Sequence, residues 1–121
     1  MNKIFFYCDS KGREPVKEIV VELSSQNSKD SRIRLSKIRD YIQVLKEHGI
    51  HRACESYIKH IEGNIWELRP LKNRILFAPV GENAFILLHI FIKKTMKTSK
   101  SEIERAKTYL DDFYAREVSD E

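Results

Sequence analysis

The hydrophobic pattern of this chain changes its period near residue 57, and this change constrains the fold more than any other feature. Before it, apolar residues recur at helical spacing; after it, they form short extended runs bounded by turn residues. These runs cover residues 57–61, 65–69, 74–80 and 85–93. The first two are separated by Glu-Gly-Asn, which predicts a hairpin.

The helical part predicts two helices, and a third follows the last strand. The first begins at Pro15, a residue that suits the first helical position. Its apolar stripe consists of Val16, Ile19, Val20 and Leu23. The second covers residues 30–48 and ends at Gly49. The third begins at residues 99–102, Ser-Lys-Ser-Glu, which have the spacing of a capping box.

A short β-prone run at residues 4–7 precedes the helices. We expect the order β-α-α-β-β-β-α, which gives one mostly antiparallel sheet with helices packed on one face. The expected fold class is therefore α+β. A chain of 121 residues is near the common size of one domain, so residues 1–121 are expected to form a single domain.

Composition favours a cytoplasmic protein. Cys8 and Cys54 are too few and too far apart for a disulfide framework, which suits a reducing compartment. The apolar run at the N-terminus is too short for a signal peptide, and the longest apolar run, residues 84–92, is far shorter than a membrane span. We expect no membrane anchor.

Positive charge is concentrated in residues 69–100. This stretch holds seven basic residues and one acid, a formal charge of +6, while the remainder holds fifteen basic and seventeen acidic residues, a charge of −2. The seven are Arg69, Lys72, Arg74, Lys93, Lys94, Lys97 and Lys100. Cations fixed on a sheet form a surface for a polyanion, and for a small basic protein this indicates nucleic acid.

The period of two along a strand sorts these side chains by face. If Leu68, Ile75 and Phe77 face the helices, Arg69 and Arg74 emerge together on the open face of the sheet. The strand over residues 85–93 delivers Lys93 and Lys94 at its end. The plainer alternative is a set of solvated charges, with Glu67 and Arg69 joined by an ordinary salt bridge.

The same alternation predicts that Trp66 is a core residue. Trp66 shares its face with Leu68 and lies opposite Glu67 and Arg69. We therefore expect its ring to pack against the helices and not to stack on bases.

Histidine residues are the other candidates for proton transfer near neutral pH. His60 lies beside Lys59 on a strand and could reach the open face, whereas His89 lies in an apolar run and is expected in the core. His48, His51 and Cys54 are spaced by three but straddle a helix end and have no fourth ligand nearby, so we expect no metal site.

Five segments together resemble HigB-type toxins of the RelE superfamily. They are residues 12–16 (GREPV), 63–70 (GNIWELRP), 73–77 (NRILF), 87–95 (LLHIFIKKT) and 102–106 (EIERA). The resemblance extends from about residue 3 to residue 114. The combination of Trp-Glu-Leu-Arg with a histidine-containing strand that ends in Lys-Lys-Thr is specific, although each piece alone is weak.

The resemblance implies the toxin of a type II toxin–antitoxin pair with a microbial RNase-like fold. Such toxins cleave mRNA in the decoding A site of the small ribosomal subunit and thereby arrest translation. The implied partner is a helix-turn-helix antitoxin of the HigA type, which also represses the operon, so operator DNA is contacted only through the antitoxin. The late catalytic tyrosine of some superfamily members has no clear counterpart here.

The leading interpretation is a metal-independent endoribonuclease without a cofactor. Phosphate binding and transition-state charge are assigned to Arg69 and Arg74, and proton transfer to Lys93, Lys94 or His60. Further RNA contacts are expected from Lys59, Lys72, Lys97 and Lys100. A non-catalytic nucleic-acid-binding module and a degenerate toxin retained for antitoxin or operator regulation remain as alternatives.

Overall fold

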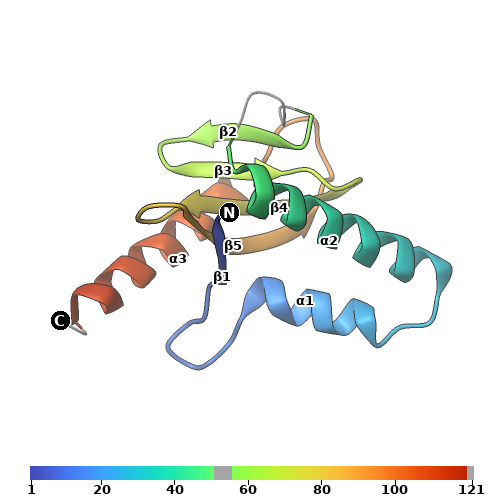
Figure 1. Cartoon of the computed structure of the whole chain (residues 1–121), viewed down its shortest axis with the longest axis horizontal. Helices are drawn as coiled ribbons and strands as arrows, with labels where there is room; N and C mark the ends of the chain where they lie inside the picture. The colour runs from blue at the N-terminus through green and yellow to red at the C-terminus, as the bar shows by residue number, and fades with distance from the viewer. Residues whose placement is uncertain (51–55, 120–121) are drawn as a thin grey trace.

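The computed structural model describes residues 1–50 and 56–119. In these ranges the elements follow the order β1 (Lys3–Phe6), α1 (Pro15–Ser24), α2 (Lys29–His48), β2 (Ile58–Glu62), β3 (Ile65–Leu68), β4 (Asn73–Pro79), β5 (Ala84–Ile92) and α3 (Lys100–Ser119) (Figure 1). The α+β class is confirmed. The expected order was one strand short, because four strands and not three separate α2 from α3; these four correspond to the four extended runs predicted from the sequence. The predicted hairpin is the β2–β3 pair, and β2 is a mostly exposed edge strand.

The five strands form one mixed sheet in the order β1-β5-β4-β3-β2. Only the β1–β5 pair is parallel among the pairs in the described ranges; β2–β3, β3–β4 and β4–β5 are antiparallel. The mostly antiparallel sheet is therefore as expected. The first strand of the chain and the last lie side by side, because Lys3–Phe6 pairs in register with residues 84–87.

Both faces of the sheet are covered, so the expectation of helices on one face is wrong. On one face α1 and α2 pack on β3, β4 and β5, with Ile38, Leu68 and Phe77 in the buried cluster. On the opposite face α3 packs through Ala106 and Leu110. The physical reason is visible in β4 and β5, which are buried along nearly their whole length, as central strands apolar on both sides must be.

The helix ends follow ordinary capping chemistry. Ser28 caps α2 by accepting the amide of Ser31, and Gly49 ends α2 with a φ of 64°, a conformation that glycine adopts without strain. At α3 only half of the expected capping box forms: the amide of Glu102 donates to Ser99 Oγ, while the Glu102 side chain turns toward His89. No helix within the described residues is long and apolar enough to cross a membrane.

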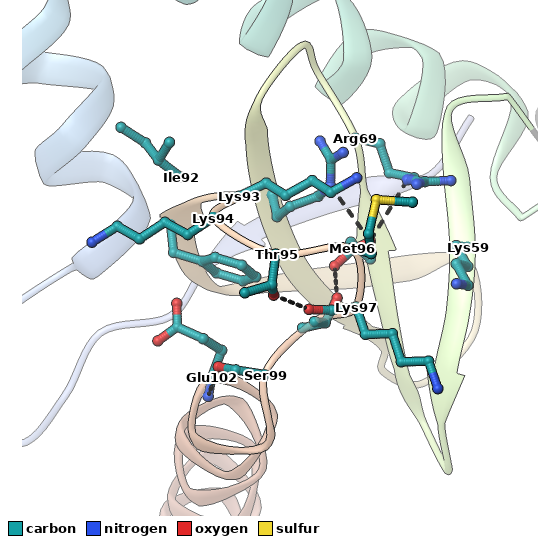
Figure 2. A pocket seen from close by; sticks show the side chains of 14 residues that line it. Lys59, Arg69, Ile92, Lys93, Lys94, Thr95, Met96, Lys97, Ser99 and Glu102 are labelled. Atoms are coloured by element: carbon teal, nitrogen blue, oxygen red, sulfur yellow. Dashed lines mark hydrogen bonds and ion pairs between the residues drawn. The ribbon is translucent and has the colours of Figure 1, made fainter.

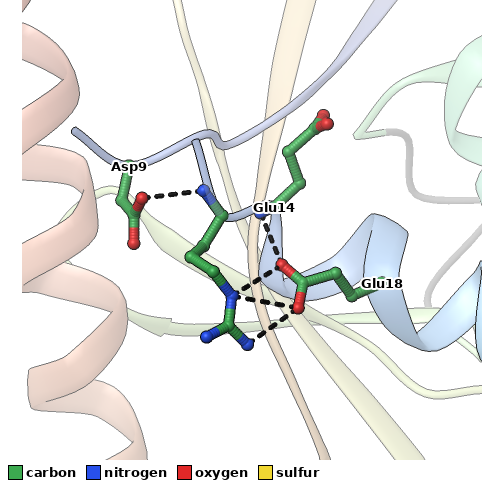
Figure 3. Close-up of polar contacts among 4 residues, drawn as sticks. Asp9, Glu14 and Glu18 are labelled. Atoms are coloured by element: carbon green, nitrogen blue, oxygen red, sulfur yellow. Dashed lines mark hydrogen bonds and ion pairs between the residues drawn. The ribbon is translucent and has the colours of Figure 1, made fainter. Parts of the chain in front are cut away.

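The connection from β1 to α1 is held by carboxylates (Figure 3). Asp9 Oδ1 accepts the amides of Lys11 and Arg13, each at 2.8 Å, which lowers the pKa of Asp9. Glu18 pairs with the Arg13 guanidinium at 2.8 Å and accepts the amide of Glu14 at 2.7 Å. The Arg13 hydrogen bond is the main cause of the lowered pKa of Glu18. Arg13 therefore closes a turn at the start of α1.

Trp66 lies on the face predicted for it, where it packs against the α1–α2 cluster, although it is only partly buried. The ring of His60 lies 4.7 Å from its ring, centroid to centroid. We predict that Trp66→Ala lowers the free energy of unfolding by about 3 kcal/mol, the lower end for large aromatic residues, because the core loses contacts and gains a cavity. Denaturant unfolding measures this. His60→Ala, which removes the neighbouring ring and its hydrogen bond to the Gly63 carbonyl but leaves Trp66 in place, is the comparison variant and should cost less. A wild-type midpoint for Trp66→Ala would contradict the core role.

Candidate functional site

A cleft of about 560 Å³ opens where the ends of β3, β4 and β5 meet the loop that leads into α3 (Figure 2). Its size is within the range of roughly 300–1,000 Å³ typical of ligand sites. The lining residues are Lys59, Glu67, Arg69, Arg74, Phe91, Ile92, Lys93, Lys94, Thr95, Met96, Lys97, Thr98, Ser99 and Glu102. Six of these are cationic and two are acidic, so the lining has a formal charge of +4.

The cleft brings together most of the residues predicted from the sequence. Arg69 and Arg74 come from β3 and β4 or their ends, and Lys93, Lys94 and Lys97 come from the loop after β5. Lys59 of β2 joins them because it pairs with Glu67 across the strands and therefore points to the same face. Cations from residues 59–97 thus meet in one place.

Three predicted residues do not line this cleft. His60 pairs with Trp66 and lies on the opposite face of the sheet, so the expectation that it reaches the face of Arg69 and Arg74 is wrong. The alternation of the strand places Lys59 and His60 on different faces. Lys72 and Lys100 are exposed but lie outside the lining.

The face carrying Arg69 and Arg74 is less open than expected. The Arg74 side chain is only 8% exposed, and its Nη1 donates to the carbonyl oxygens of Leu71 and Asn73 at 2.8 and 2.7 Å. The side chain of Arg69 is 35% exposed. Arg74 is therefore a fixed cation in the floor of the cleft, and Arg69 is the more accessible guanidinium.

Glu67 occupies the centre of this floor and is almost fully buried. Its Oε1 lies 3.7 Å from Nε of Arg69 and 3.7 Å from Nε of Arg74. Burial lowers the pKa of Arg74, the charge of Glu67 raises it, and the charge of Arg69 lowers it. The alternative of solvated surface charges thus fails for Glu67 and Arg74, which are packed inside the protein.

The hydroxyl of Thr98 donates to Glu67 Oε2 at 2.5 Å. This bond joins β3 to the loop of residues 93–99, which supplies three of the cleft's lysines. Sequence reasoning treated Glu67 only as a salt-bridge partner and did not consider Thr98. The available signal was the position of Glu67 between apolar neighbours in a short strand, where a carboxylate requires buried partners.

Glu102 is a second cleft carboxylate that sequence reasoning treated only as a capping residue. Its Oε1 lies 3.4 Å from Nε2 of His89, which is buried as predicted. Burial lowers the pKa of His89; Glu102 partly offsets this, and Arg105 adds to it. The ring of His89 also stacks at 5.6 Å on Phe91 in the cleft wall.

The suggested metal-like spacing involves two residues, His51 and Cys54, that lie outside the described residues. In the described part of the chain, no group of three or more histidine, cysteine or acidic side chains is arranged to hold a metal ion.

Comparison with known proteins identifies the family of this chain. Residues 21–111, three quarters of the chain, match the family described as Phage derived protein Gp49-like (DUF891). The chain therefore belongs to the Gp49-like family, a family of toxins from toxin–antitoxin systems within the RelE/HigB-like superfamily. Membership implies an antitoxin as partner. No match was found among curated proteins.

We predict that Thr98→Val loosens the cleft. Valine has nearly the same shape but leaves Glu67 without its hydroxyl donor, and a hydrogen bond to a charged group contributes about 1.5–3 kcal/mol. The free energy of unfolding should fall by this amount, and amide exchange over residues 93–99 should become faster. Thr108→Val is the control, since this exposed hydroxyl donates to the carbonyl of Glu104 on α3, outside the loop. Equal exchange rates in wild type and Thr98→Val would contradict the anchoring role.

We also predict a pH-dependent loss of stability that originates at His89. Because burial favours the neutral ring in the folded state, the unfolded chain takes up this proton at a higher pH than the folded chain. The contribution is complete above the unfolded pKa of about 6.5 and is lost as the pH falls below it. Denaturant unfolding at pH 7.5 and 5.5 should show a smaller difference for His89→Leu than for wild type. Identical pH dependence in both proteins would show that His89 is not responsible.

Proposed function

We propose that this chain is a HigB-type endoribonuclease that cleaves mRNA on the ribosome. One observation carries the proposal: in a member of a toxin family, six cations converge on one cleft, two of them guanidinium groups held by a buried carboxylate. Guanidinium groups bind phosphate through paired donors, and fixed cations stabilise charge that develops in a transition state.

The proposed reaction needs no metal ion, because the substrate supplies its own nucleophile. A base removes the proton of the ribose 2′-hydroxyl, and the 2′-oxygen attacks the adjacent phosphorus atom. The bond from phosphorus to the 5′-oxygen breaks, and this oxygen takes a proton from an acid. The products are a 2′,3′-cyclic phosphate and a 5′-hydroxyl end.

Arg69 is assigned to the reacting phosphate because it is the exposed guanidinium of the cleft, and Arg74 supplies fixed positive charge below it. Lys93 and Lys94 are the proton-transfer candidates from the sequence, and the structure adds the cleft carboxylate of Glu102. His60 has no role in this proposal, since it lies on the other face. Lys59 and Lys97 would hold the flanking phosphates.

The proposed partner is a HigA-type helix-turn-helix antitoxin, and operator DNA would be bound through that antitoxin alone. The ribosome would determine much of the choice of cleavage sequence, because the cleft of about 560 Å³ would hold only a short stretch of RNA. Exposed Lys72 and Lys100, outside the cleft, would contact RNA more weakly. The site of action would be the bacterial cytoplasm.

Controlled expression in a bacterium tests the proposal. Wild-type protein should arrest growth and produce cleaved mRNA, whereas Arg69→Ala should lower cleavage by about a hundredfold or more, the usual cost of one transition-state donor. Arg69 is preferable to Arg74 for this test because Arg74 is buried and its loss would also destabilise the fold. Lys72→Ala removes the same charge outside the cleft and should retain nearly full activity.

Cleavage should persist in purified ribosome assays with a chelator present. Unimpaired growth and intact mRNA at high levels of folded wild-type protein would overturn the proposal. RNA binding without cleavage would favour the non-catalytic module. Equal losses of cleavage activity in Arg69→Ala and Lys72→Ala would indicate that the active site does not lie in the cleft.

A further inference from the structure

Three apolar side chains interrupt the charged lining of the cleft. Phe91 is partly buried beside Arg74, its neighbour across the strands, and Ile92 ends β5 with 48% of its surface exposed. Met96 lies in the following loop and is 89% exposed. Isolated exposed apolar residues are common on proteins, so exposure alone carries no conclusion. Here, however, all three line one cleft together with its cations, and Met96 is the one that lies beside Arg69, whereas Ile92 points away from both (Figure 2).

The loop presents Met96 in a defined position. The hydroxyl of Thr95 donates to the carbonyl of Lys97 at 2.6 Å, which closes a turn around Met96. Two residues later, Thr98 is bonded to buried Glu67. Figure 2 shows Met96 projecting from this loop on the same side as Arg69 and Lys93. Hydrogen bonds on both sides of Met96 thus limit the conformational freedom that binding would otherwise have to remove.

A ligand for this lining must carry both negative charge and a flat apolar surface. Inorganic phosphate would satisfy the cations but would leave Met96 in water. A nucleotide satisfies both, since its phosphate can meet the guanidinium groups while its base covers the apolar rim. Thioether sulfur makes favourable contacts with aromatic faces, and base stacking tolerates every base because each has a π-face.

We propose that Met96 forms a nucleobase subsite, which holds a base of single-stranded RNA next to the phosphate bound by Arg69. This inference rests on the proposed function, because it takes RNA as the ligand. The subsite would position the chain for cleavage and would add a contribution to affinity that is independent of charge.

The test compares two fluorescent probes in anisotropy titrations. One is a short 2′-O-methyl RNA, which cannot be cleaved because its 2′-oxygen is blocked; the other is an abasic oligomer with the same backbone. Wild type should bind the RNA several-fold more tightly than the abasic probe. Met96→Ser should weaken RNA binding about five-fold, equivalent to about 1 kcal/mol, without changing the abasic affinity.

Val21→Ser is the matched control, since Val21 is 55% exposed on α1 and does not line the cleft. Equal weakening of both probes by Met96→Ser would show a general loss of loop structure, and no effect on either would show that the rim does not contact bases. Weakened binding of the antitoxin alone would make the rim a protein contact. Each of these results overturns the subsite. Because the probes are not cleaved, absent ribonuclease activity would overturn the proposed function while leaving this binding result separate.

Discussion

The carboxylate of Glu67, buried between the guanidinium groups of Arg69 and Arg74, is the interaction on which the cleft depends. Two guanidinium groups this close repel each other, and burial opposes the charge of Arg74 further. The negative charge at 3.7 Å from both Nε atoms partly offsets these effects. Since the other carboxylate oxygen accepts the Thr98 hydroxyl, the same group that stabilises the cations also fixes the loop with the lysines. Local electrostatics and loop position are therefore coupled through one side chain.

The covering of the sheet explains why the cleft lies at a strand end. With α1 and α2 on one face and α3 on the other, the middle of β4 and β5 is inaccessible to a macromolecular ligand. Helix α3 begins at Lys100, so it does not cover the ends of β3 and β4. The loop that precedes α3 lines the cleft at these ends. The polar side chains at the ends of β3 and β4 therefore lie beside an open cleft and not under a helix.

The sequence predicted most of the charged residues that line the cleft, but it did not predict how deeply some of them are buried. Alternation placed Arg69, Arg74 and Glu67 on one face and Trp66 on the other, as found, because a period of two depends only on the backbone. Alternation did not reveal that α3 packs on the face that carries Arg69 and Arg74, because the face on which a helix packs depends on the fold of the whole chain. Three further features were not predicted, because each depends on contacts between residues distant in sequence. They are the burial of Arg74, the hydrogen bond between Thr98 and Glu67, and the contact of Glu102 with His89 in place of its expected local cap. His60 was placed on the wrong face, whereas its neighbour Lys59 lines the cleft, and strict alternation alone would have separated the two.

The cleft divides its cations into two physically different groups. Arg74 is fixed by two carbonyl oxygens and a carboxylate, so its position requires no reorganisation when charge develops nearby, the property that makes electrostatic stabilisation effective. Lys94 and Lys97 are exposed and lie on the loop, where flexible ammonium groups can follow a phosphate as it enters. Under the proposed function, the fixed floor would bind the reacting phosphate, and the flexible lysines of the loop would bind the rest of the strand. Thr98 connects the loop that carries the flexible lysines to Glu67, the same buried carboxylate that pairs with Arg69 and Arg74. A change in the loop should therefore alter the position of the guanidinium groups, and a change at Glu67 should alter the loop.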